Sequence, residues 1–278
     1  MLAMMLKGGG EPQVILHIGM QKTATTFLQW NVFHYLDVNY LWHIFYKPFL
    51  KGFLDFRKKV DLKKTKDTFP MYLKEEKVNL ISEENLYTSM FSKHDDRLIM
   101  LDRVKTVFPK AKIIFGTREK DEILPSWYKE YVAVGGVLNY EDFIDTHMNL
   151  DKLDYKPYVE ELKNHYGSEN VFVYSLDDMK KNQEELITKM CEFMDVETPK
   201  DYRKTPARVG YSPIMIKVSL FLNKIFKTPL NNKGLIPWWG PVLPHNILFH
   251  SFLFRKRPQK KLKLDDLKKI NVFKKKKK

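Results

Sequence analysis

Short runs of branched apolar residues alternate along the chain with longer segments of helical periodicity. Four such runs, each too short for a helix, predict buried strands at residues 13–18, 77–82, 111–117 and 170–175. Apolar residues that recur every three or four positions predict helices at residues 95–108, 125–134, 140–148, 157–166, 183–194 and 213–226. Strands that alternate with helices at this spacing indicate an α/β fold, in which helices flank both faces of a central parallel sheet.

Two stretches depart from this pattern. Residues 37–69 are rich in lysine and aromatic residues but have no clean period, so we expect an irregular, partly helical excursion. This excursion would either lie over the strand ends and help to form an acceptor site, or form a solvated hairpin at the periphery. Residues 255–278 are strongly basic, and we expect them to form a disordered tail behind a single domain at residues 1–254.

The net charge of the chain is concentrated in that tail. The 278 residues carry a net charge of +14, and thirteen Lys and Arg against two Asp place +11 of it after Phe254. The folded body is therefore close to neutral, and we expect no nucleic-acid partner. A non-enzymatic basic protein that binds nucleic acid or anionic lipid remains an alternative.

Composition also bears on the compartment. Residues 1–12 are too short and too interrupted for a signal peptide, and no run of about 18 apolar residues occurs. The single cysteine, Cys191, falls in a helical apolar pattern that predicts a core position, so we expect a cytoplasmic protein. Residues 235–254 either close the fold or lie on a bilayer surface, where the basic tail would bind anionic lipid as a peripheral membrane contact.

The turn after the first predicted strand carries the strongest chemical signal. Gly19 ends that strand, and a lysine and three threonines crowd the turn that follows: Lys22, Thr23, Thr25 and Thr26. Their polar groups, together with the unpaired N–H groups of a helix start, suit an anion. An ordinary turn with incidental threonines is the alternative, because helix starts favour Ser and Thr.

The kind of anion follows from the spacing in this turn. A nucleoside-triphosphatase loop has a second glycine before its lysine, but here Gln21 occupies that place. The pattern G-x-x-K-T-x-[ST]-[ST] instead resembles the 5′-phosphosulfate loop of sulfotransferases, which have a P-loop-like fold. That resemblance implies 3′-phosphoadenosine 5′-phosphosulfate (PAPS) as sulfuryl donor and its desulfated form, PAP, as product. It implies donor contacts from Gln21, Lys22, Thr23, Ala24, Thr25 and Thr26.

Two later segments are similar to the same family. Arg118 leaves the third predicted strand and Ser126 follows eight residues later, as in the family's 3′-phosphate motif. Alternatively, Arg118 pairs with Glu119 or Glu122 and Ser126 caps a helix. Residues 170–196 resemble the family's next strand, acidic turn and helix, but Leu176 stands where a tyrosine is usual. Arg208 and Gly210 resemble a late basic–glycine loop that contacts the 3′-phosphate in some relatives, with an ordinary surface position as the alternative for Arg208.

Sulfuryl transfer needs a cation on the leaving oxygen and a base at the acceptor. Lys22 fits the first role. Glu83 ends the second predicted strand and is our candidate base, with Glu84 in reserve, although such glutamates are often caps or solvated charges. His17 is expected in the core, and His43 is a minor alternative base. No spacing typical of a metal site occurs, so we expect no metal.

The sequence does not identify the acceptor, for which a hydroxyl or amine of a carbohydrate or glycan is the leading hypothesis. A kinase or NTPase that uses Lys22 and Thr23 as in a P-loop is the main alternative. It is disfavoured by the missing glycine and by the lack of a strand that ends in a magnesium-binding aspartate.

Overall fold

The computed structural model describes residues 11–42, 44–89, 91–202 and 211–237. These residues fall into two compact units. The sheet unit comprises Met1–Ser89, Asp95–Arg118 and Asp151–Ala207, and the helical unit comprises Met90–His94, Glu119–Leu150 and Arg208–Lys278. The single domain over residues 1–254 and the tail over 255–278 stay predictions, and the tail lies outside the described residues.

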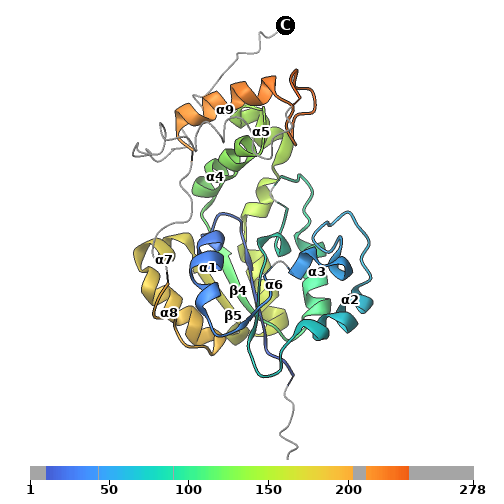
Figure 1. Cartoon of the computed structure of the whole chain (residues 1–278), viewed down its shortest axis with the longest axis vertical. Coiled ribbons are helices and arrows are strands. Elements are labelled where there is room, and N and C mark those ends of the chain that lie inside the picture. The colour runs from blue at the N-terminus through green and yellow to red at the C-terminus, as the bar shows by residue number, and fades with distance from the viewer. Residues whose placement is uncertain (1–10, 43, 90, 203–210, 238–278) are drawn as a thin grey trace, which may run out of the picture. The chain divides into compact units, whose positions relative to one another are not determined.

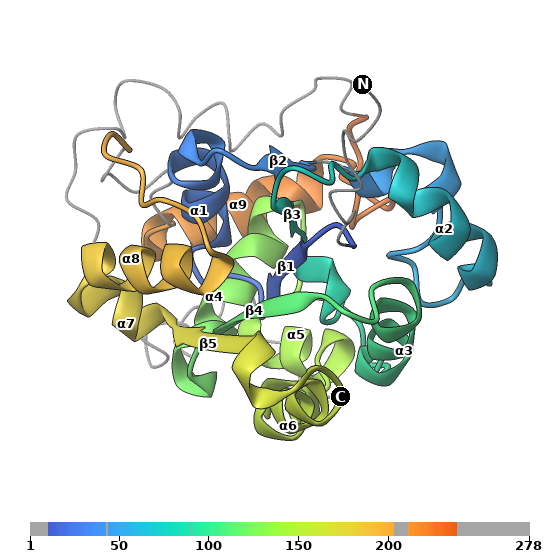
Figure 2. The same ribbon diagram turned by 90° about the horizontal axis from the view of Figure 1, so that it is seen from below.

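A five-stranded parallel sheet forms the centre of the sheet unit (Figures 1 and 2). Its strands lie in the order β2-β3-β1-β4-β5, and their bounds are β1 Val14–Gly19, β2 Asn39–Tyr40, β3 Asn79–Ser82, β4 Lys112–Thr117 and β5 Val171–Ser175. The four strands predicted from sequence are confirmed, as is the α/β class. The edge strand β2 was missed because two residues are too few to show a period.

The strands that follow β1 in sequence are added to the sheet on both sides of β1, so the strand order has a switch point there. After β1 the chain runs to β2 and β3 on one side, and after β4 it runs to β5 on the other side. Ligands of open parallel sheets bind at the carboxyl ends of the strands beside such a switch point. At that edge Gly19 of β1 lies opposite Gly116 of β4, so the two central strands end there with no side chain between them.

Helices cover both faces of this sheet, as predicted. Figure 2 shows α1 (Thr25–Asn31), α7 (Leu176–Lys181) and α8 (Gln183–Met194) on one side, with α3 (Arg97–Val107) and α6 (Lys156–Tyr166) on the other. One apolar core joins the first set to the sheet, and its buried residues include Phe27, Leu28, Phe33, Ile187, Met190 and Met194. Cys191 lies within this core and is 1% exposed, which confirms its predicted structural position. The excursion at residues 37–69 holds β2, short 3-10 turns and α2 (Leu62–Thr68).

The helical unit contains α4 (Lys120–Ala133), α5 (Tyr140–His147) and α9 (Pro213–Ile225). Asn139 caps α5 and Ser212 caps α9. The predicted start of α4 at Pro125 is wrong, because the helix begins five residues earlier, at Lys120. Proline favours the first turn of a helix, where its missing N–H has no partner to lose. In α4, Pro125 lies inside the helix and one backbone hydrogen bond is lost. This loss is tolerated in a helix whose first turn carries Asp121 and Glu122, which stabilise the positive end of its dipole.

The side chain of Asn223 joins two helices of this unit. Its amide donates to the carbonyls of Val132 and Gly136, both at 2.9 Å, and so attaches α9 to the end of α4. Within the described ranges, no helix is long and apolar enough to cross a bilayer.

Candidate active site

Two glycines allow the loop between β1 and α1 to fold down onto the sheet. A Cβ on Gly19, whose φ is +131°, would lie 2.4 Å from the carbonyl oxygen of Gly116. A Cβ on Gly116 would lie 2.6 Å from the hydroxyl of Thr23. The amide of Met20 then donates to the Gly116 carbonyl at 2.9 Å. The sequence analysis missed Gly116, because its partner is distant in the chain.

The backbone of this loop is held in an uncommon conformation. Lys22 and Ala24 have φ values of +68° and +66°, a left-handed region in which residues other than glycine are rare. Each such residue costs of order 1–3 kcal/mol, and these costs cluster at functional sites. No side chain caps α1, and its first turn holds no acidic residue. The loop therefore presents backbone N–H groups in a turn of the kind that binds anions.

The predicted donor residues divide between the inside and the outside of this loop. The hydroxyl of Thr23 donates to the Met20 carbonyl at 2.8 Å and closes the loop from within. Thr25 is 5% exposed and also faces inward. Lys22, Ala24 and Thr26 are half-buried. The side chain of Gln21 is buried and donates to the carbonyl of Thr88. Lys22 and Thr26 are thus the predicted polar residues that remain partly open to solvent.

A chain of hydrogen bonds supports the loop from below. The hydroxyl of Tyr174 donates to the Thr23 carbonyl at 3.1 Å, so it must accept from Nε2 of His17 at 2.9 Å. Nδ1 of His17 then accepts from the hydroxyl of Ser82 at 2.7 Å, and Ser82 accepts from the amide of Gln29 at 3.0 Å. This assignment follows from the direction of the bonds. It connects the end of β3 to the loop after β1.

His17 is a structural member of this chain. It is 1% exposed, and burial lowers its pKa to about 3. The ring is therefore neutral at physiological pH, so one ring nitrogen donates a hydrogen bond and the other accepts one. The prediction that His17 is a core residue is confirmed, whereas His43 lies outside the described residues.

Glu83 and Glu84 follow β3 at the same edge of the sheet. The amide of Glu83 donates to the His17 carbonyl at 3.0 Å, and its carboxylate accepts from the backbone and side-chain amides of Asn85 at 3.1 and 2.8 Å. Burial raises the pKa of Glu83, and the two Asn85 bonds oppose that rise. Glu84 begins a 3-10 turn and is half-buried. Because β1 and β3 are adjacent parallel strands, both glutamates leave the sheet beside the loop.

Arg118 is brought to the loop, whereas its predicted partner lies in the other unit. The guanidinium of Arg118 donates from Nη1 to the Lys22 carbonyl at 3.0 Å. Ser126 lies within α4 and is half-buried. The alternative role of Ser126 as a helix cap is wrong, because α4 starts at Lys120. The joint 3′-phosphate role of Arg118 and Ser126 stays a prediction, and Arg208 and Gly210 lie outside the described residues.

Metal-ligating side chains do not gather in the part of the chain that the structure describes. No group of three or more His, Cys, Asp or Glu there could hold a metal ion. Burial raises the pKa of the Cys191 thiol to about 11, so this residue is a thiol rather than a thiolate ligand at neutral pH.

Comparison with known proteins gives one family and several distant structures. The model of the sulfotransferase family matches residues 13–200, which is well over half of the chain. A sulfotransferase from Alicyclobacillus acidocaldarius is similar, with 15% identity, 77% of this chain and 93% of that chain covered, and a TM-score of 0.48. A mouse sulfotransferase, SULT7A1, complexed with PAP is 13% identical, with 68% and 61% of the chains covered and a TM-score of 0.38. No curated protein matches this chain.

Proposed function

The chain belongs to the sulfotransferase family, and we propose that it transfers the sulfuryl group of PAPS to a hydroxyl or amine of a carbohydrate acceptor. The observation that carries this proposal is the loop between β1 and α1. Within the matched region it combines left-handed backbone at Lys22 and Ala24, an uncapped helix start and a lysine at the carboxyl edge of the sheet. That combination fits the 5′-phosphosulfate end of the donor.

The residues present fit a donor that carries phosphate at both ends. The loop N–H groups, with Lys22 and Thr26, would hold the 5′-phosphosulfate. Arg118 lies next to this loop through its bond to the Lys22 carbonyl, and its guanidinium would bind a 3′-phosphate, as a guanidinium fork commonly does. Gln21, Thr23 and Thr25 would act by shaping the loop, because their side chains are buried within it.

Glu83 and Lys22 have separate roles in the proposed transfer step. The acceptor oxygen attacks sulfur as it loses its proton to Glu83, while the bond between sulfur and the bridging oxygen of the 5′-phosphate breaks. The electron pair of that bond stays on the phosphate oxygen, where the ammonium of Lys22 stabilises the developing charge. Burial raises the pKa of Glu83, which makes its carboxylate a better base than an exposed glutamate.

An exposed cluster of aromatic rings near Glu83 supports a carbohydrate acceptor. Trp30 of α1 is 49% exposed, and its ring lies 4.6 Å from that of Trp42 and 5.6 Å from that of His34. His34 also packs against Tyr40 at 5.0 Å. Tyr40 lies on β2, which pairs with β3, the strand that Glu83 follows, so the cluster lies on the strand next to that carboxylate. Burial raises the pKa of Tyr40, and the charge of Glu83 adds to this rise. Amphipathic aromatic rings of this kind bind the apolar faces of sugars.

Calorimetry without metal tests the donor. We expect PAP to bind and ADP and ATP to bind weakly, because neither of them carries a 3′-phosphate. Release of PAP from PAPS with a panel of mono- and oligosaccharides, and with a simple phenol, then tests the acceptor. Binding of ATP but not PAP would overturn the donor, and turnover with the phenol alone would overturn only the carbohydrate.

The pH dependence of turnover tests the base. The base must be deprotonated, and burial raises its pKa, so kcat/KM should rise with pH through a value above the ordinary glutamate value of about 4.3. Glu83→Gln should abolish this limb and lower kcat by about 10²–10⁴-fold, whereas Glu84→Gln should keep it. The opposite result would assign the role to Glu84.

The localisation and the tail are also proposals. A cytoplasmic protein that contacts an anionic membrane through residues 255–278 agrees with the +11 carried by that stretch. Removal of Lys260–Lys278 should then reduce binding to vesicles of anionic lipid without lowering turnover of a soluble acceptor. Equal binding by both forms would remove the membrane from this proposal.

A further inference from the structure

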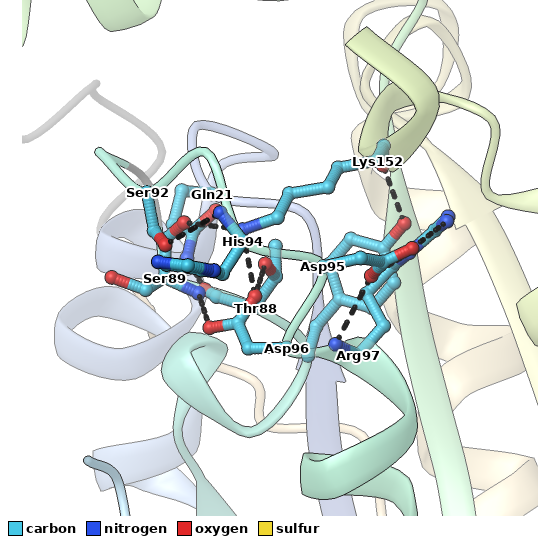
Figure 3. Close-up of polar contacts among 10 residues, drawn as sticks. Gln21, Thr88, Ser89, Ser92, His94, Asp95, Asp96, Arg97 and Lys152 are labelled. Carbon is cyan, nitrogen blue, oxygen red and sulfur yellow. Dashed lines mark hydrogen bonds and ion pairs between the residues drawn. The ribbon is translucent and has the colours of Figure 1, made fainter. Parts of the chain in front are cut away.

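A fully buried ion pair lies close to the donor loop without being part of it. Nζ of Lys152 and Oδ1 of Asp96 are 2.7 Å apart, and their side chains are 1% and 2% exposed (Figure 3). Both residues belong to the sheet unit. Taking two charges out of water costs several kcal/mol per ion, and an apolar pair of similar volume is often no less stable. Stability alone is therefore a poor account of this pair.

The ion pair holds one short segment of backbone. The hydroxyl of Thr88 donates to Oδ1 of Asp96, and the amide of Ser89 donates to Oδ2 at 2.8 Å. The hydroxyl of Tyr87 donates to the carbonyl of Lys152 at 2.8 Å. Thr88 and Ser89 are thus attached to the carboxylate of Asp96, and Tyr87 is attached to the backbone of Lys152. These three residues end the segment that begins with the candidate base Glu83.

The same segment holds the donor loop. The carbonyl of Thr88 accepts from the side-chain amide of Gln21, which is 2% exposed and directly precedes Lys22 (Figure 3). This bond fixes the orientation of the amide, because a flipped amide would bring two oxygens together. The other atom of that amide, Oε1, is buried and has no hydrogen-bond partner among the described residues. Gln21 is held at this place even though one of its polar atoms is unsatisfied.

Asp96 and Lys152 are therefore connected both to the donor loop and to the segment that carries the candidate base. Through Thr88 and Gln21 they reach Lys22, and through residues 83–89 they reach Glu83. We propose that Asp96 and Lys152 are positioning residues for sulfuryl transfer, whose ion pair fixes the place of the donor loop relative to the segment that carries the base. This inference rests on the proposed function. Misplacement of reacting groups by about 1 Å can cost 10²-fold in rate, so a small shift of this segment is enough to matter.

The variants are chosen to separate positioning from folding. Asp96→Leu with Lys152→Met removes both charges together and leaves no buried charge unpaired. Thr88→Val keeps the pair and the shape of the side chain but removes the hydroxyl bond to Asp96. Gln21→Met removes only the bond between the loop and Thr88. Asp95→Asn is the matched control, because Asp95 pairs with Arg97 at 2.7 Å at the start of the same helix.

The measurements are the thermal midpoint, the dissociation constant of PAP and the rate of PAP release from PAPS. An active saccharide serves as acceptor, or water where none is active. We expect the double variant to keep its thermal midpoint within a few degrees and its PAP affinity within about threefold, and to lose about 10–100-fold in kcat. Thr88→Val should lose less, and Asp95→Asn should lose nothing. Gln21→Met added to the double variant should cause little further loss, because the two act through one path.

Two results would overturn the positioning role. One is a folded double variant with wild-type kcat. The other is a proportional fall in thermal midpoint, PAP affinity and kcat, which indicates structural support only. If the double variant fails to fold, Thr88→Val decides, since wild-type kcat in that variant would contradict the proposal. A wild-type protein that neither binds PAP nor consumes PAPS would instead overturn the proposed function.

Discussion

Two strand-to-helix turns lie at the same edge of the sheet and differ in whether a side chain caps the backbone N–H groups of the helix that follows. The turn from β5 to α7 closes on itself. Ser175 and Asp178 form a capping box, in which the Asp178 amide donates to the Ser175 hydroxyl at 3.0 Å and the Ser175 amide donates to the Asp178 carboxylate at 2.9 Å. The turn from β1 to α1 has Ala24 at the cap position, no capping side chain and no acidic residue in its first turn.

This difference shows how one fold separates stability from binding. The β5 turn satisfies the N–H groups of Ser175 and Asp178 within itself and places the charges of Asp177 and Asp178 where an external anion would otherwise bind. The β1 turn leaves its helix start uncapped, holds two residues in left-handed backbone, and adds the cation of Lys22. It is the less stable turn of the two by local rules, and it is the one that suits a phosphosulfate.

Removal of the cation from the open turn should have the largest effect. Lys22→Ala should lower kcat by about 10²–10³-fold, because Lys22 stabilises the negative charge that develops on the leaving oxygen only during transfer. The fold should persist, since Lys22 is half-buried and outside the core. Single-turnover measurements of PAPS consumption check this. The matched control is Lys180→Ala on α7, which removes an exposed pair with Asp177 and should keep full activity.

Arg118 gives the next largest effect, because it directly follows β4, the strand that lies between β1 and β5. It donates to the Lys22 carbonyl in the first turn, and its charge contributes to the lowered pKa of Asp177 in the second, where Lys180 is the main cause. Arg118→Ala should weaken PAP binding by about 1.5–3 kcal/mol, as expected for a hydrogen bond to a charged group. Calorimetry with PAP and with 5′-AMP checks the site. A loss confined to PAP indicates the 3′-phosphate, and an equal loss for both ligands indicates that Arg118 acts by supporting the loop.

The two turns also show what the sequence could and could not predict. The Lys–Thr turn after an apolar strand, and the bounds of α8 at Gln183–Met194, follow from local spacing and were predicted. Gly116 and Tyr174 support the loop from β4 and β5, about a hundred residues or more away in the chain, and no local pattern indicates such contacts. The inward hydroxyl of Thr23 was missed for a related reason. A sequence pattern shows that hydroxyl-bearing residues lie near a site, but it does not show which hydroxyls point toward the ligand and which point into the loop.

A charge placed in the open turn should make it resemble the closed one. Ala24→Asp would supply a carboxylate at the cap position of α1, and Asp tolerates left-handed backbone better than Ala. We expect PAP affinity to fall by about 5–30-fold, equivalent to 1–2 kcal/mol at a helix start, while the free energy of unfolding rises slightly. Calorimetry at two salt concentrations and chemical denaturation check both effects. Ala24→Asn, which caps without charge, should lose much less PAP affinity, and an equal loss would show that the charge is not the cause.

Opening the closed turn should have the smallest effect, and only on stability. Ser175→Ala removes the cap of α7 and should lower the free energy of unfolding by about 1 kcal/mol, with no change in PAP affinity. The hydrogen bonds from Ser175 lower the pKa of Asp178, so their contribution is fully present above the carboxyl pKa of the unfolded chain and is lost as the pH falls through the lower folded value. The stability difference between wild type and variant should therefore narrow in acid, which denaturation at pH 7 and pH 3 measures. A variant that binds PAP more tightly would mean that the capped turn, too, takes part in donor binding, and the contrast between the two turns would then be wrong.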